Sequence, residues 1–93
     1  EVSPEDTELL YAVSRSLKSA SGGKKSVLLR AAEFGERCSL RSPDMIKNLV
    51  NLADIQRLLG NSDRVRELAS RALELNPSEE KARKILESLP GGR

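Results

Sequence analysis

The sequence has 93 residues, enough for one small domain with a modest hydrophobic core. Its 16 basic and 14 acidic residues give a net charge of +2, a mixed-sign surface that argues against a nucleic-acid-binding footprint. No apolar run approaches the ~18 residues that a membrane-spanning helix needs. No secretory signal pattern is present either.

The numbers of histidines and cysteines limit which catalytic and metal-binding sites the chain could form. The chain has no histidine, which removes the usual general base, the commonest metal ligand and every Ser–His or Cys–His pair. The lone Cys38 cannot form an internal disulfide, which is compatible with a reducing, intracellular compartment. We therefore expect no enzyme, no cofactor and no metal, and we interpret Cys38 as a small core residue.

A first helix is predicted near the N-terminus. Residues 3–6 combine a serine cap, a proline suited to the first turn and acids that favour the positive end of the helix dipole. The helix should run to about Lys18. Gly22 and Gly23 follow a few residues later and predict a loop. Because the chain begins with Glu1 rather than Met, we expect a fragment of a longer protein. Whether more helices precede it stays open.

A second helix is predicted from Lys25 to about Cys38. The stretch before it, residues 22–26, ends like a phosphate-binding loop but lacks the earlier glycine and the leading strand, so we interpret it as a flexible basic turn. The expected buried side of the helix consists of Val27, Leu28, Ala31, Phe34, Gly35 and Cys38.

The third and fourth helices are predicted to form an antiparallel pair. Gly60 can take the left-handed conformation that ends a helix, and Ser62 can cap the next one. Asn76 and Pro77 should end the pair and start a further helix. Apolar residues at helical spacing in the pair are Ile46, Leu49, Val50, Leu52, Ala53, Ile55, Leu58, Leu59, Val65, Leu68, Ala69, Ala72, Leu73 and Leu75.

A fifth, more polar helix follows. Asn76 and Glu79 have the spacing of a capping box. The apolar stripe of this helix is narrow, and the remaining positions are charged, which is typical of an element that closes a helical stack. The stripe consists of Ala82, Ile85, Leu86 and Leu89. Residues 90–93 should be disordered.

Small residues at the expected helix contacts resemble the pattern of the tetratricopeptide repeat, whose period is about 34 residues. Pro43 and Pro77 are 34 residues apart, and residues 72–77, ALELNP, are similar to the end of that repeat. The matching positions are Ala53, Gly60, Val65, Ala69, Ala72 and Pro77. Leu49 and Gln56 depart from the family, which often has Trp and Tyr there.

The resemblance implies an all-α fold of antiparallel helix-hairpin repeats, with about five helices and a C-terminal capping helix. Residues 43–77 form the well-matched repeat and residues 78–89 the capping helix. Residues 4–42 read as a degenerate repeat, with an excess of five residues that we place in the glycine loop.

The resemblance also implies a function, because stacks of this family bind extended or helical peptides in a concave groove lined by the first helix of each repeat. We expect a protein-interaction module, within a larger protein or scaffold, for a partner that is at least locally acidic. The expected partner-binding residues are Tyr11, Arg15, Lys47, Asn51, Asp54, Arg57, Lys81 and Lys84.

Three alternatives bear on that function. One subtype of the family grips a terminal carboxylate with five polar residues. Only Asn51 and Lys81 match that set, whereas Tyr11, Arg15 and Ile85 occupy the other positions. Homo-association end to end through first-helix residues such as Leu9 is the second alternative. RNA binding through basic helix faces is the third, and the near balance of charge argues against it.

Overall fold

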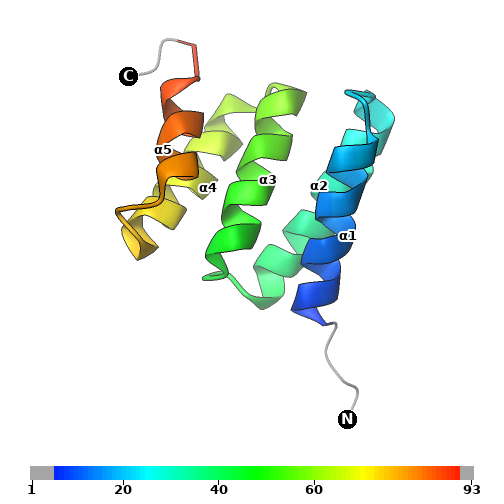
Figure 1. Ribbon diagram of the computed structural model, residues 1–93, viewed down its shortest axis with the longest axis horizontal. Coiled ribbons are helices and arrows are strands. Elements are labelled where there is room, and N and C mark those ends of the chain that lie inside the picture. The colour runs from blue at the N-terminus through cyan, green and yellow to red at the C-terminus, as the bar shows by residue number, and fades with distance from the viewer. Residues whose placement is uncertain (1–5, 91–93) are drawn as a thin grey trace.

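The structure is a computed structural model that describes residues 6–90, and within them it contains five helices and no strands. The predicted all-α fold with five helices is therefore confirmed. The helices are α1 (Thr7–Ala20), α2 (Lys25–Arg41), α3 (Ile46–Leu59), α4 (Ser62–Leu75) and α5 (Glu80–Glu87) (Figure 1). The predicted helix start at residues 3–5 and the end of the predicted tail, residues 91–93, lie outside the described residues.

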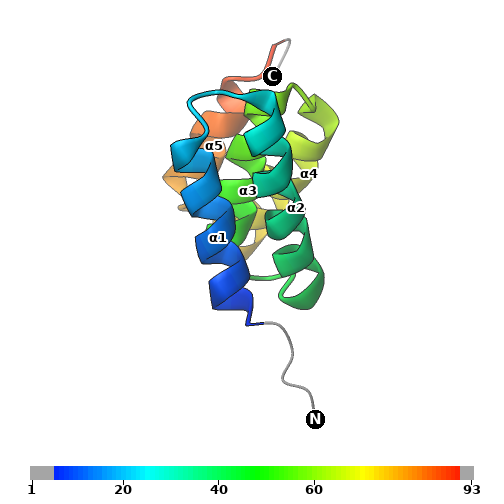
Figure 2. The same cartoon turned by 90° about the vertical axis from the view of Figure 1, so that its right-hand side faces the viewer.

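Successive helices run antiparallel, so that α1–α2 and α3–α4 form two hairpins and α5 folds back against α4 (Figures 1 and 2). Helices α1, α3 and α5 lie on one side of the molecule, and α2 and α4 lie on the other. Helix α3 contacts all four of the other helices. This central position explains why α3 is buried on most of its circumference, including at its polar residues Asn48, Asn51 and Gln56. Within residues 6–90, no helix is long and apolar enough to cross a membrane.

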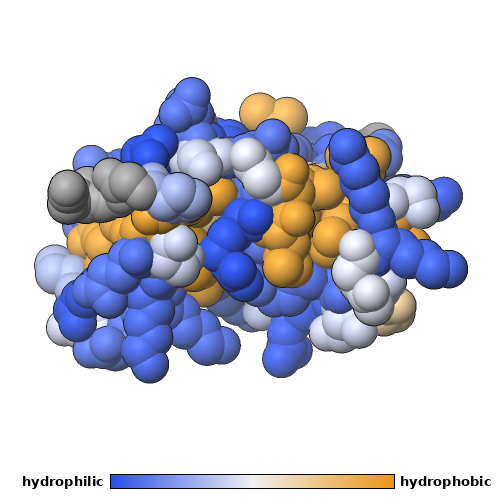
Figure 3. Space-filling model, turned by 90° about the horizontal axis from the view of Figure 1, so that it is seen from above, coloured by the Kyte–Doolittle hydropathy of each residue, from blue (hydrophilic) through white to orange (hydrophobic). Residues whose placement is uncertain are grey.

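The hydrophobic core runs through both hairpins and α5. Small side chains lie where helices meet, and Ala53, Ala69 and Ala72 have no exposed surface, as predicted. Leu52 and Ile55 are the largest fully buried apolar side chains, each stabilising the fold by about 1.5–3 kcal/mol through burial. Seen from the end that carries the α1–α2 and α3–α4 loops, apolar residues run along the middle between hydrophilic ones (Figure 3).

The 34-residue period of the sequence recurs in the backbone of two turns, residues 42–45 and 76–79. The N–H of Ser42 donates to the Cys38 carbonyl, and the N–H of Asn76 donates to the Ala72 carbonyl, both at 2.8 Å. Within each turn, the N–H of the fourth residue donates to the carbonyl of the first. Met45 donates to Ser42 at 3.2 Å, and Glu79 donates to Asn76 at 3.0 Å.

Both prolines lie inside these turns, so the predicted start of the fifth helix at Asn76 and Pro77 is wrong. Pro43 and Pro77 each follow the first residue of their turn, and the next helices begin only at Ile46 and Glu80. This is the turn position that the fixed φ of proline suits.

Helix caps also differ from the sequence predictions. Asp6 caps α1, because its Oδ1 accepts hydrogen bonds from the N–H groups of Glu8 (3.0 Å) and Leu9 (3.4 Å). Ser62 is the first residue of α4 rather than its cap, and Asn61 before it makes no side-chain cap bond. The predicted capping box is absent, since Asn76 Oδ1 instead accepts from the N–H of Ser78 at 3.1 Å, inside the turn.

The extra residues of the first hairpin are shared between a loop and a helix. Helices α1 and α3 have 14 residues each, but α2 has 17 and α4 has 14. The α1–α2 loop spans residues 21–24, whereas residues 60–61 suffice between α3 and α4. Placing the whole excess in the loop was therefore wrong. The predicted left-handed conformation of Gly60 is confirmed, with φ of 85°.

Candidate functional site

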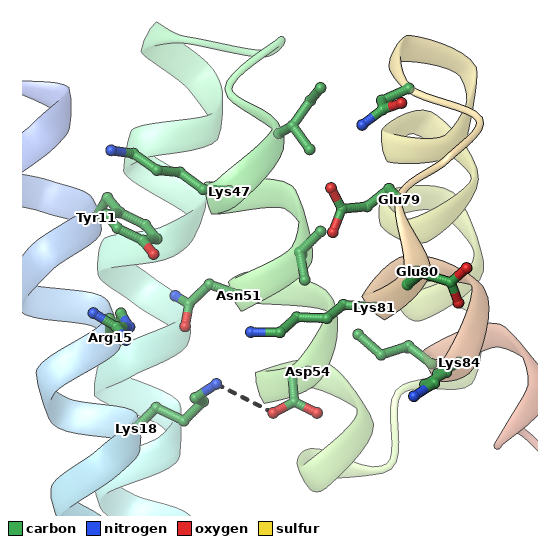
Figure 4. A pocket seen from close by; sticks show the side chains of 14 residues that line it. Tyr11, Arg15, Lys18, Lys47, Asn51, Asp54, Glu79, Glu80, Lys81 and Lys84 are labelled. Atoms are coloured by element: carbon green, nitrogen blue, oxygen red, sulfur yellow. Dashed lines mark hydrogen bonds and ion pairs between the residues drawn. The ribbon is translucent and has the colours of Figure 1, made fainter.

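A groove of about 740 Å³ crosses α1, α3 and α5 (Figure 4). Seven of the eight predicted partner-binding residues line it, namely Tyr11, Arg15, Lys47, Asn51, Asp54, Lys81 and Lys84. Arg57 does not line it. The sequence analysis missed Lys18, Ile46, Val50, Asn76, Glu79, Glu80 and Ile85, which complete the lining.

Apolar side chains form part of the groove wall. Ile46 and Val50 come from α3, and Ile85 comes from α5. Val50 and Ile85 are buried, yet both border the groove. Helical spacing identified these residues as core-facing, but spacing alone does not show which core residues also reach a surface hollow. The groove therefore offers apolar contact as well as charge.

Asp54 is held by two cations at one end of the groove. Lys18 Nζ lies 3.2 Å from Asp54 Oδ2 (Figure 4). Arg57 Nη2 lies 2.7 Å from Asp54 Oδ1. Burial disfavours the charged carboxylate, but the hydrogen bonds from Arg57 and Lys18 outweigh it and lower the pKa of Asp54. Arg57 thus pairs with Asp54 from beside the groove, whereas the sequence analysis had placed it among the residues of the groove.

Lys47 joins α3 to α1 at the other end of the groove. Its Nζ lies 2.7 Å from Glu8 Oε1 and 5.0 Å from the centre of the Tyr11 ring, a cation–π arrangement. The hydrogen bond from the ammonium to Glu8 raises the pKa of Lys47. Tyr11 and Lys47 therefore contact each other before any ligand binds.

Asn51 lies between α1 and α3 and is only 6% exposed. Its Nδ2 donates to Ser14 Oγ at 3.0 Å, and that hydroxyl donates to the Ala31 carbonyl at 2.8 Å. The side chain thus ties the two hairpins together. Its Oδ1 is buried and accepts no hydrogen bond from the described residues.

Three cations of the groove have no acidic partner within residues 6–90. They are Arg15 on α1, and Lys81 and Lys84 on α5, so they stand on both sides of the central helix α3 (Figure 4). Of the acids in the lining, Asp54 is paired as described and Glu80 Oε2 accepts from Arg83 Nη1 at 3.0 Å. Glu79 is the remaining carboxylate. The groove therefore has an excess of available positive charge.

Cys38 has the surroundings of a core residue rather than of a nucleophile. Its side chain is fully buried, and its thiol donates to the Thr7 carbonyl at 3.4 Å and lies 3.7 Å from Met45 Sδ. Burial, with a smaller contribution from Glu8, raises the pKa of Cys38 and favours the neutral thiol. Elsewhere in residues 6–90 no group of three or more His, Cys, Asp or Glu could hold a metal ion.

No family model, no curated protein and no solved structure matches this chain.

Proposed function

We propose that the chain is a tetratricopeptide-like protein-interaction module, and that it binds a locally acidic peptide segment in the groove across α1, α3 and α5. The main observation that supports this proposal is the placement of Arg15, Lys81 and Lys84 around an apolar wall. No acidic side chain of the described residues forms an ion pair with them. The recurrence of one turn geometry 34 residues apart supports the repeat relationship.

The wall and the cations supply different parts of the binding energy. An apolar side chain of the ligand would pack against Ile46, Val50 and Ile85, where water is displaced from apolar surface. Carboxylates flanking that side chain would accept hydrogen bonds from Arg15 and the two lysines, which are stronger than bonds between neutral groups. A ligand that is both acidic and apolar fits this combination best.

The ion pairs of Asp54 indicate which part of the groove would receive the acidic side chains of the ligand. Lys18 and Arg57 are already engaged by Asp54, so that end of the groove offers little free positive charge. We therefore expect the acids of the ligand to lie toward Arg15, Lys81 and Lys84. Charged contacts that lose water on binding typically matter by about 2–5 kcal/mol when one partner is removed, whereas rim contacts matter little.

Selection of peptides from a random displayed library would test this proposal without a known partner. The chain is the bait, and the double variant Lys81→Glu, Lys84→Glu serves for counter-selection. We expect an enriched motif with at least two acids beside an apolar residue. By calorimetry, its peptide should bind the double variant at least about tenfold more weakly, a loss of about 1.4 kcal/mol or more.

The matched control carries the same charge change away from the groove. Lys25→Glu, Arg66→Glu alters two exposed cations on α2 and α4 and should leave the affinity within about twofold, because surface charges outside the site act weakly through solvent. Enriched peptides without acids, or an equal loss in both double variants, would refute an acidic ligand in this groove.

A further inference from the structure

Glu79 is the one carboxylate of the groove lining that has no cationic partner within residues 6–90. It belongs to the turn before α5, and its side chain is half-buried. The carboxylate does not cap α5 either, because this helix has no side-chain cap bond. A carboxylate that loses part of its hydration is usually compensated by a cation or a hydrogen bond. Among the described residues, the charge of Glu79 is therefore left uncompensated.

The backbone of the turn holds Glu79 in place at the wall of the groove. Its N–H donates to the Asn76 carbonyl at 3.0 Å, and its carbonyl accepts from the N–H of Arg83 at 3.2 Å. One 34-residue period earlier, the equivalent turn has Met45 at this position, and Met45 Sδ lies 3.7 Å from Cys38 Sγ. The same turn thus forms with an uncharged side chain there, so its geometry does not require the carboxylate of Glu79.

The uncompensated charges of the groove are separated along its length. Figure 4 shows Glu79 at the end of the groove that carries Lys47, whereas Lys81 reaches from α5 toward Asn51 and Asp54 on α3. The other two unpaired cations lie on either side of the Lys81 ammonium, one on α1 and one on α5. One part of the groove therefore presents a free acid, and the next part presents free cations.

Lys47 lies at the same end as Glu79 but is engaged by α1. Its ammonium lies 2.7 Å from Glu8 Oε1 and 5.0 Å from the centre of the Tyr11 ring. A cation supplied by a ligand would consequently find Glu79 as the available carboxylate at this end of the lining.

We infer that Glu79 pairs with a lysine or arginine of the bound peptide, so that the ligand carries a basic residue on one side of its apolar residue and acids on the other. This inference rests on the proposed function, because it assigns a second charge to the ligand of the same groove. The groove residues of α3 run from Ile46 to Asp54, which is about 12 Å along the helix and about four residues of an extended peptide. The basic residue is thus expected about four positions from the acids.

Such a ligand binds in one direction only. If the segment were reversed, its acids would face Glu79 and its basic residue would face Arg15, Lys81 and Lys84, and like charges placed together oppose binding. A uniformly acidic segment would likewise bring an acid to Glu79. The groove therefore favours a segment of separated charge over one that is only acidic.

The peptides selected on this chain from the random displayed library supply the probe, with both peptide ends blocked so that the termini carry no charge. We expect a lysine or arginine about four positions from the acids. By calorimetry, replacing that residue with glutamine should weaken binding to the wild-type chain by about fivefold, as for a partly solvated ion pair. The same replacement should change the affinity for Glu79→Gln by less than about twofold, because the pair is already lost.

The matched control is Glu87→Gln, which neutralises an exposed carboxylate on the same helix outside the groove lining. The fivefold effect should persist in this variant. A second selection, with Glu79→Lys as the bait, should yield peptides with an acid in place of the basic residue.

The outcomes separate this inference from the proposed function. Selected peptides with acids but no basic residue, or an equal effect of the peptide replacement in wild type and Glu79→Gln, would overturn the role of Glu79 and leave the acidic ligand standing. Loss of the effect in Glu87→Gln alone would place the contact outside the groove and overturn it as well. Selected peptides without acids would refute the proposed function and, with it, the pairing of Glu79.

Discussion

The two sides of α3 are built from different chemistry. Toward α1 and α2 it presents polar groups, with Asn48 bonded to Gly35 and Asn51 bonded to Ser14. On the other side, every buried residue of α4 and α5 is apolar, including Ala72 and Ile85. Apolar burial supplies energy without direction, whereas buried hydrogen bonds require one register. The difference indicates that the second hairpin and α5 hold together by packing and that the junction with the first hairpin is fixed by directional bonds.

A polar network extends the directional side to α4. Gln56 Oε1 accepts from Asn61 Nδ2 at 2.6 Å, and Gln56 Nε2 donates to Glu36 Oε2 at 3.4 Å. Glu36 also accepts from Arg64 on α4, and this bond raises the pKa of Arg64. One carboxylate of α2 therefore connects to Gln56 of α3 and to Arg64 of α4.

The largest effect is expected from breaking the apolar side. Ala72 is fully buried on α4, so Ala72→Glu would place an unpaired carboxylate in the core and destabilise the domain by about 3–5 kcal/mol. Ser70→Glu, at an exposed position of the same helix, should cost less than about 0.5 kcal/mol. Urea unfolding followed by circular dichroism measures both, and an unchanged midpoint for Ala72→Glu would show that the core packing described here is wrong.

A smaller effect is expected at the directional junction. In Gly35→Ala the new Cβ would lie 2.8 Å from Leu52 Cδ1 and 3.2 Å from Ser14 Oγ. Overpacking costs about 1–3 kcal/mol, and the better helix propensity of alanine returns about 1 kcal/mol. The same unfolding experiment should show a net loss of about 1 kcal/mol. A gain in stability would mean that the hairpins can separate slightly at no cost, contrary to a junction fixed by its hydrogen bonds.

Lowering the pH should weaken the ion pairs of Asp54 with Lys18 and Arg57 and thereby reduce the stability of the folded chain. Its pKa is lowered in the folded state, so its stabilising contribution is present above the unfolded value of about 3.9 and is lost as the pH falls below it. Between about pH 5 and pH 3 the wild-type chain should therefore lose more stability than Asp54→Asn. Parallel losses in the two proteins would show that the Lys18–Asp54–Arg57 contacts contribute nothing to folding.

The smallest effect is expected in the α1–α2 loop, which belongs to neither side of α3. Lys24 is exposed, and its hydrogen bonds within residues 6–90 come from its backbone alone, so Lys24→Ala should shift the free energy of unfolding by less than about 0.5 kcal/mol. Thermal melting at neutral pH suffices for the measurement. A larger change would indicate that the loop contributes to the hairpin junction.

The sequence predicted the helices and the small residues between them because both leave a local, periodic pattern, as Ala53 and Ala72 show. Caps were missed because the choice between neighbouring polar residues depends on how the turn closes, as with Asn76, whose side chain bonds within its own turn. Arg57 was placed in the groove although its spacing from Asp54, three residues along a helix, already indicated an ion pair. The bond from Asn51 to Ser14 joins residues distant in the chain and left no local signal.

The central claim is that the groove across α1, α3 and α5 is the binding surface. Amide chemical-shift mapping with the peptide selected on this chain tests it most directly, because it reports every face at once. We predict that the largest shifts fall at Arg15, Asn51 and Lys81, and that the exposed residues Arg66 and Glu67 of α4 stay unchanged. Shifts concentrated on α2 and α4, with the groove residues unmoved, would contradict the claim.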